Sequence, residues 1–237
     1  MDFSLTDDQQ NVRDAVLKHC SQFSDDYWLD LDNKGEFPLE FHQSMADAGW
    51  LGIAMPESVG GANLGIAEAT LMMQAIAESG AGMTGASSVH MPVFGLQPVN
   101  IFGTSEQQQA WLPPVISGEH KVCFGVTEPN TGLDTTKLKT RAEKRDGGYL
   151  VNGEKIWIST AQVANKMLLL ARTTALEDVQ RKTDGLSLFY TDLDRSKIEV
   201  RAIHKMGRHA VDSNMLFIND LWVPEERLIG EEGQGFK

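Results

Sequence analysis

The chain has 237 residues, of which 41% are hydrophobic and 23% are charged, which suits one large domain or two with a globular core. Its 33 acidic residues against 21 basic ones give a formal net charge of -12, and this charge argues against non-specific binding to a nucleic-acid backbone. An anionic ligand would therefore need a local site made of backbone N–H groups and a few basic side chains.

The first half of the chain is predicted to be helical. Thr6 and Gln9 form a capping-box pattern, and apolar residues then recur at helical spacing at Val12, Val16, Cys20 and Phe23. A second helix is expected after Pro38, ending near Gly49. Further helices are expected over residues 66–77, 87–102 and 105–116.

From residue 121 onward the apolar period falls to two and β-branched residues become more frequent, which is typical of strands. Strands are expected over residues 122–126, 138–144, 149–151, 154–158, 167–172, 186–191, 198–205 and 215–223. Asn152-Gly153 favours the positive φ angles of a type I′ turn and predicts a hairpin at that point. Together these patterns predict an antiparallel barrel or sandwich of about seven strands.

The predicted fold class is therefore α+β, with an all-α domain over residues 1–118 and a β domain over residues 119–230. Residues 231–237 follow the last strand, and we expect them to begin a further region. The N-terminus lacks the basic start and apolar run of a secretory signal, and the two cysteines cannot build a disulfide framework. The longest aliphatic run, residues 167–171, is too short to cross a bilayer. We expect a soluble protein of the cytoplasm.

The familiar patterns of metal binding and nucleophilic catalysis are missing from the sequence. Its six histidines lack the spacing of metal ligands, so no metal site is predicted. No Gly-x-Ser-x-Gly motif occurs. Gly230, Gly233 and Gly235 superficially match a dinucleotide fingerprint, but they follow a Val-Pro turn instead of opening a βαβ unit.

Residues 124–134 carry the first pattern with chemical meaning. An apolar strand ends at Thr127, after which Pro129 fixes φ and Gly132 allows a sharp turn. Such a loop exposes successive backbone N–H groups, which can hold the edge of a flat heteroaromatic ring or a pyrophosphate.

Residues 153–160 carry the second pattern. Trp157 and Ser159 are two residues apart and share one strand face, whereas Ile158 faces the opposite way. An aromatic wall beside a hydroxyl donor is what a flavin ring would need. The alternative, from spacing alone, is a buried Trp and a strand-end Ser in an ordinary β core.

Four separated motifs give the chain a resemblance to the acyl-CoA dehydrogenase family. They are Gly49–Ile53 with Pro56–Gly61, Thr127-Glu128-Pro129 with Gly132 and Asp134, Asn152–Ser159, and Lys205-Met206-Gly207 with Val223-Pro224. The resemblance covers the chain from its first helix to its last residue. It implies a helical N-terminal domain, a middle β domain and a C-terminal four-helix bundle, and we expect this chain to lack the bundle.

The resemblance implies an FAD-dependent oxidoreductase of fatty acid metabolism that converts an acyl-CoA thioester into the 2,3-enoyl-CoA. A carboxylate removes the α proton while the β hydrogen leaves as hydride to the flavin. The implied cofactor contacts are Phe124, Val126, Thr127, Gly132, Leu133, Trp157, Ile158 and Ser159. Leu133 stands where the family usually has Ser, and it is also expected to border the substrate.

No catalytic residue is assigned within this chain, because the family's glutamate base lies in the C-terminal bundle. Glu128 is expected to be structural, and the chain alone is expected to be inactive. The resemblance also implies an electron-transferring flavoprotein as electron acceptor and a homo-dimer or homo-tetramer when the protein is complete. No nucleic-acid or membrane partner is expected.

Other functions remain open. An acyl-CoA oxidase or a flavin monooxygenase would share this fold and differ in its reaction with oxygen. A non-catalytic flavin-binding subunit could pair with a second subunit that brings the base. The plainest alternative is a β domain that binds no flavin.

Overall fold

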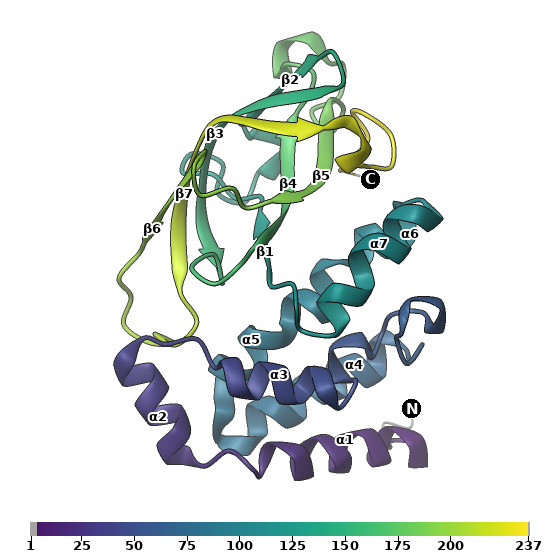
Figure 1. Cartoon of the computed structure of the whole chain (residues 1–237), viewed down its shortest axis with the longest axis vertical. Coiled ribbons are helices and arrows are strands. Elements are labelled where there is room, and N and C mark those ends of the chain that lie inside the picture. The colour runs from purple at the N-terminus through teal and green to yellow at the C-terminus, as the bar shows by residue number, and fades with distance from the viewer. Residues whose placement is uncertain (1–3, 237) are drawn as a thin grey trace. The chain divides into compact units, whose positions relative to one another are not determined.

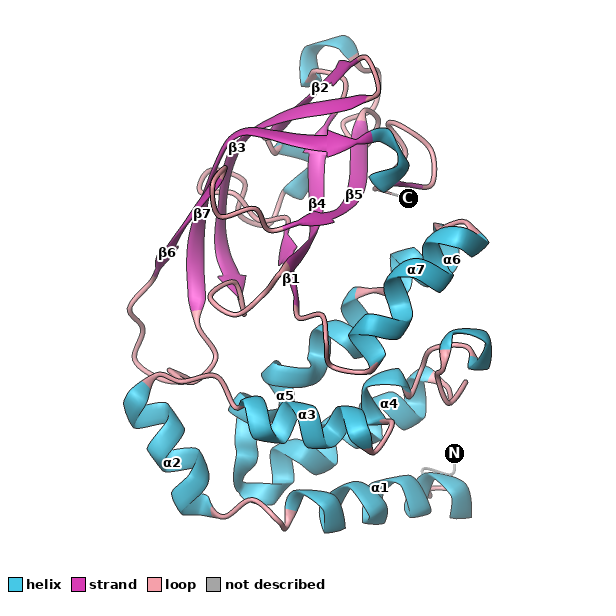
Figure 2. Cartoon of the chain, in the orientation of Figure 1, coloured by secondary structure: helices cyan, strands magenta, loops and turns pink. Residues whose placement is uncertain are grey.

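The computed structural model of the chain describes residues 4–236. The first three residues and Lys237 lie outside that range. The expectations about a signal sequence and a following region rest partly on these residues. The described chain forms two compact units, one mainly helical and one built on a β-sheet (Figures 1 and 2). The helical unit holds the chain as far as Gln97 together with Gln109–Glu119 and Lys205–Val211, and the β unit holds Pro98–Gln108, His120–His204 and the chain from Asp212.

The described helices follow the sequence prediction in most places. They are α1 (Asp7–Cys20), α2 (Asp25–Lys34), α3 (Leu39–Asp47), α4 (Ile66–Ile76), α5 (Gly82–His90), α6 (Gln97–Phe102) and α7 (Ser105–Ile116). The predicted capping box of α1 is confirmed, because the Gln9 N–H donates to the Thr6 hydroxyl and the Thr6 N–H donates to the Gln9 side-chain oxygen, both at 3.2 Å. No helix within residues 4–236 is both long enough and apolar enough to cross a bilayer.

Two helix predictions need correction. Helix α2 was not predicted, although Ser24 caps it and accepts a hydrogen bond from the Tyr27 N–H at 3.3 Å. The helix expected over residues 87–102 is interrupted by a π-helical turn, Met91–Gly95, between α5 and α6. Pro92 within that turn has no N–H to donate to the preceding turn, which accounts for the break in α-helical bonding.

The β unit is built on one sheet of eight strands among the described residues, where about seven were predicted. The strands are β1 (Val122–Gly125), β2 (Arg141–Arg145), β3 (Gly148–Ser159), β4 (Lys166–Arg172), β5 (Leu186–Asp192), β6 (Ile198–Ala202), β7 (Ser213–Pro224) and β8 (Leu228–Ile229). They lie in the order β6-β7-β3-β2-β4-β5-β8, with β1 beside β4. Figure 2 shows these strands gathered in one unit.

The sheet corrects one part of the predicted fold class. The predicted order, a helical part followed by a β part, is confirmed. The predicted antiparallel arrangement is wrong, because β1 pairs with β4 in parallel and the sheet is therefore mixed. It also stays open, since β6 and β8 end the strand order and do not pair with each other. The short strand β8, only two residues long, was not predicted.

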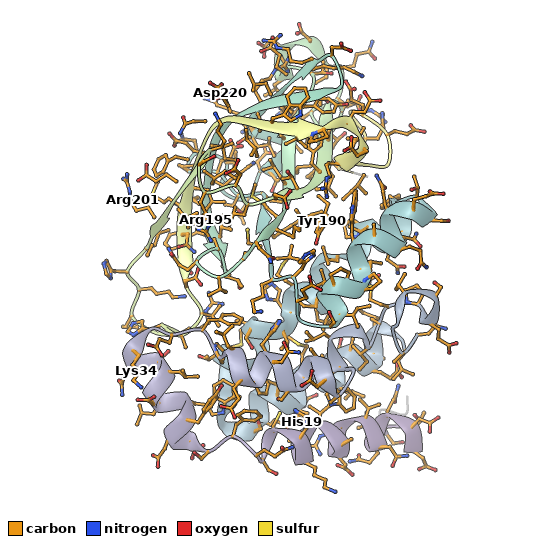
Figure 3. The ribbon with its side chains drawn as sticks, in the orientation of Figure 1. His19, Lys34, Tyr190, Arg195, Arg201 and Asp220 are labelled. Carbon is orange, nitrogen blue, oxygen red and sulfur yellow. The ribbon has the colours of Figure 1, made fainter. Side chains whose placement is uncertain are left out.

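The hairpin predicted at Asn152-Gly153 is wrong. Strand β3 runs unbroken through both residues, and the turn between β2 and β3 is instead formed by Asp146-Gly147, where Gly147 has a φ of 78°. Asn152 bonds across the sheet to Asp220, whose N–H donates to the Asn152 side-chain oxygen at 2.9 Å. Asp220 is labelled in Figure 3. Gly153 is required there by close packing, because an added Cβ would lie 2.4 Å from the Thr140 hydroxyl oxygen.

Candidate functional site

Two backbone segments of the β unit lie side by side where the sequence predicted a ligand site. Strand β1 stops pairing with β4 after Gly125, and the chain then runs along β3. The Ile156 N–H donates to the Thr127 carbonyl at 2.9 Å. We call the surface formed by residues 124–127 and 156–159 the shelf. The structure thus brings together the residues predicted from the two separate motifs.

A bulge in β3 presents Trp157 on the shelf. Lys155 is paired with Leu216 and Ile158 with Asn214, so β3 has one residue more than β7 between these pairs. Trp157 has a φ of 61°, which is rare for a bulky side chain and is maintained only when the surrounding structure enforces it. Its side chain is 59% exposed.

The neighbours of Trp157 alternate as the sequence predicted. Ile158 is buried in the hydrophobic core of the β unit, whereas Ser159 is half-buried. The side chain of Ile158 therefore faces away from the shelf, and a ligand could meet only its backbone. The predicted alternative of a buried Trp does not hold, because Trp157 is exposed.

The loop after β1 leaves further apolar surface open. Phe124 is 43% exposed, Leu133 is fully exposed, and Val126 and Thr127 are half-buried. Gly132 has a φ of 45°, and a Cβ added there would meet no atom within 4 Å. Exposed aromatic and aliphatic side chains gain free energy when a ligand removes them from water. The shelf is an open surface of this kind.

Beneath the shelf lies a buried ion pair. The Lys155 ammonium donates to the Glu128 carboxylate at 2.9 Å, and the two side chains are 0% and 7% exposed. The Glu128 oxygen that Lys155 contacts, Oε1, also accepts from the Thr140 N–H at 2.9 Å. The second oxygen, Oε2, accepts from the Lys139 N–H at 2.6 Å. The prediction that Glu128 is structural agrees with these contacts. The burial of Lys155 was missed, since a lysine in a strand is ordinarily expected at the surface.

The ionisation of this pair follows from its surroundings. Burial acts to raise the pKa of Glu128, but the charge of Lys155 and the hydrogen bonds from Thr140 and Lys139 outweigh it, so the pKa is lowered overall. Burial lowers the pKa of Lys155 to about 8, although the charge of Glu128 acts to raise it. The contacts themselves suit a carboxylate and an ammonium, because Glu128 accepts from three donors and Lys155 donates to three acceptors.

Two arginines fix the loops on either side of the shelf. Arg172 on β4 donates to the carbonyls of Leu138 at 3.1 Å and of Asp184 at 3.1 Å, which secures the loop that follows Leu133. Arg195, on the loop between β5 and β6 (Figure 3), donates to the carbonyls of Ala161 at 2.6 Å and of Ala164 at 3.2 Å. The chain entering and leaving the shelf is thus held by charged hydrogen bonds.

Two cavities of the β unit are lined by residues outside the shelf. One of about 520 Å³ is lined by Pro98, Ile101, Phe102, Leu188, Ile229, Gly230, Glu231, Gln234 and Gly235. A second, of about 200 Å³, lies beside Glu128 and is lined mainly by polar side chains. None of the predicted cofactor contacts lines either cavity. Residues 4–236 place no group of three or more His, Cys, Asp or Glu side chains where they could hold a metal.

Known protein families match nearly the whole chain. The model of the acyl-CoA dehydrogenase N-terminal domain matches residues 6–119, and that of the acyl-CoA dehydrogenase middle domain matches residues 123–221. A probable acyl-CoA dehydrogenase of Bacillus subtilis, YngJ, is 31% identical over 238 residues, covering all of this chain and 62% of the relative.

Solved structures give the same result. The acyl-CoA dehydrogenase of Geobacillus kaustophilus matches with a TM-score of 0.91 at 27% identity, over all of this chain and 61% of that one. A glutaryl-coenzyme A dehydrogenase in complex with glutaryl-CoA matches with a TM-score of 0.90 at 27% identity, over all of this chain and 60% of that one. The chain thus spans less than two thirds of the length of these proteins.

The ion pair beneath the shelf can be tested by replacing Glu128 with Gln. At neutral pH the change is expected to lower the free energy of unfolding by about 3–5 kcal/mol, because the buried ammonium loses its counter-charge. A carboxyl whose pKa is lowered by folding stabilises the fold above its ordinary pKa, and the stabilisation is lost as the pH falls through the folded-state pKa. The gap between wild type and E128Q should therefore shrink as the pH falls from neutral into the acid range, as measured by urea unfolding.

The matched control is Glu143→Gln on β2. Glu143 is half exposed and pairs with Arg145 at 2.7 Å, so this change is expected to alter the free energy of unfolding by less than about 1 kcal/mol. A gap for E128Q that does not vary with pH would contradict the ion-pair account.

Proposed function

Because the chain belongs to the acyl-CoA dehydrogenase family, we propose that it binds FAD on the shelf and serves the α,β-dehydrogenation of an acyl-CoA thioester. The observation that carries the proposal is the exposed aromatic surface of Trp157 and Phe124. Trp157 is held there in a strained backbone conformation, which a protein retains mainly where the residue is needed for binding. The residues present therefore suit a large flat aromatic group.

In this proposal each predicted contact has a distinct part. Trp157 packs against one face of the isoalloxazine, and Phe124 and Val126 border it. Thr127 and Ser159 offer hydroxyl and backbone groups to the ring edge, and Ile158 contributes backbone alone. Gly132 and Leu133 lie beside the pyrophosphate, where Leu133 also borders the substrate and leaves out the hydroxyl that the family usually has.

The chemistry that bound FAD supplies is acceptance of the hydride from the β carbon of the acyl chain. The α proton needs a separate carboxylate within hydrogen-bond reach. Glu128 is unsuited to that role, because it is buried and both of its oxygens accept hydrogen bonds from Lys155, Lys139 and Thr140. We therefore infer that the proton acceptor comes from outside the shelf.

The remaining parts of the proposal rest on the family resemblance. They are an electron-transferring flavoprotein as the electron acceptor and a homo-oligomeric assembly. A place in the cytoplasm is proposed from the cysteine usage of the sequence. Acyl-CoA thioesters are proposed as the substrate class. The support is the similarity to two solved structures, an acyl-CoA dehydrogenase and a glutaryl-coenzyme A dehydrogenase in complex with glutaryl-CoA.

Flavin binding is tested by titrating the chain with FAD and following the visible absorption of the bound flavin. Trp157→Ala is expected to raise the FAD dissociation constant about two- to tenfold, since loss of an aromatic stacking partner costs about 0.5–1.5 kcal/mol. Trp222→Ala is the matched control, because Trp222 is a 45% exposed tryptophan on β7 that is no part of the shelf. Equal losses of affinity in both variants, or no flavin binding by the wild type, would contradict the proposal.

The reaction is tested by adding acyl-CoA and an artificial electron acceptor to the FAD-loaded 237-residue chain. We expect acyl-CoA to shift the flavin spectrum without steady-state reduction of the acceptor, because Glu128 cannot take the proton. Sustained turnover would show that a base lies within this chain. Hydrogen peroxide as the product would favour the oxidase alternative.

A further inference from the structure

The Lys155 ammonium has three protons and three acceptors. Besides the Glu128 carboxylate at 2.9 Å, it donates to the carbonyl oxygens of Val126 at 3.0 Å and Leu170 at 2.8 Å. These acceptors lie on two segments, the loop after β1 and strand β4, and Lys155 itself lies on a third, strand β3. A single buried side chain thus ties the loop that carries the predicted flavin contacts to the strand beneath it.

The contact with Val126 has a consequence for the next residue. The peptide bond between Val126 and Thr127 is trans, as every peptide bond described here is, so its C=O and N–H point in opposite directions. Because the Val126 carbonyl points at the buried Lys155 ammonium, the Thr127 N–H points the other way. The Thr127 carbonyl is fixed as well, by the Ile156 N–H at 2.9 Å.

We propose that Lys155 is a positioning residue of the shelf, which holds the Val126–Thr127 peptide so that the Thr127 N–H faces outward to an acceptor atom on the edge of a bound heteroaromatic ring. The inference deepens the proposed FAD binding and rests on it. Lys155 itself touches no ligand in this arrangement, since its side chain is fully buried.

The buried pair needs such an explanation, because apolar side chains of similar volume in place of both Lys155 and Glu128 would often serve stability as well or better. Glu128 neutralises that charge and is itself held by the N–H groups of Lys139 and Thr140. The Glu128 carboxylate is therefore fixed in place and holds the Lys155 ammonium. The ammonium in turn holds the Val126 carbonyl. An orientation fixed before binding reduces the entropy lost when the ligand arrives.

The test compares Lys155→Met, Glu128→Gln and the control Val223→Ala in the full chain. Lys155→Met removes the donor to the Val126 carbonyl. Glu128→Gln removes the counter-charge but keeps that donor. Val223 is fully buried at the opposite end of the β3–β7 pairing, so its replacement lowers stability without touching the loop. Should Lys155→Met fail to fold, the double variant E128Q/K155M removes the donor without leaving a buried charge.

Two measurements are made on each folded variant. The first is the FAD dissociation constant together with the positions of the absorption bands of the bound flavin. The second, made without ligand, is the backbone order parameter of the Thr127 N–H from ¹⁵N relaxation, for which about 0.85 marks a rigid amide and values below about 0.6 a flexible one.

The proposal expects K155M, or the double variant, to bind FAD about tenfold more weakly, the effect of one lost hydrogen bond. It also expects shifted flavin bands and a Thr127 amide that becomes flexible, whereas V223A stays close to wild type in both measurements and E128Q, which keeps the donor to Val126 but loses the counter-charge, lies between wild type and K155M. A rigid Thr127 amide in K155M, or equal losses of affinity in K155M and V223A, would overturn it. If the wild type binds no FAD, the proposed function fails, and the ligand-free amide measurement alone decides the positioning role.

Discussion

The buried pair of Lys155 and Glu128 is the interaction on which the shelf depends. Taking two charges out of water is expensive, and it is tolerated here because each remaining hydrogen-bonding group of the pair has a backbone partner. Those partners belong to the loop after β1, to the chain entering β2 and to β4. The pair thereby fixes the course of a loop that has little apolar contact of its own, since Pro129, Asn130, Gly132 and Leu133 are all exposed.

The second constraint is the bulge that turns Trp157 outward. A regular strand would let successive side chains alternate, but one extra residue against β7 gives Trp157 a left-handed backbone while Ile158 returns to the core. The strain at Trp157 is borne by the sheet pairing on both sides of it. Together with the ion pair, the bulge gives an open surface a defined shape, and a flat ligand can be recognised there without a closed cavity.

The sequence was most informative where local signals agree with the final packing. The capping box at Thr6 predicted the start of α1, and the alternation around Ile158 predicted which side chain is buried. It failed where a distant strand decides the outcome. The turn propensity of Asn152-Gly153 is overridden by pairing with β7. There β7 has one residue more than β3 between the pairs Val151–Leu221 and Gly153–Ile218, and Asp220 takes the positive φ of 49°. The partnership of Lys155 with Val126 and Leu170 is likewise invisible, since it depends on how three segments come together.

The central claim is that the two backbone segments of the shelf seat the flavin. Hydrogen–deuterium exchange of the chain with and without saturating FAD tests it most directly, because it maps the binding surface without assuming any residue's role. The account predicts slower exchange on binding in residues 124–134 and 153–160, with the rest of the β unit unchanged. Protection confined to the cavity lined by Ile101, Phe102 and Ile229, with the shelf unaffected, would contradict it.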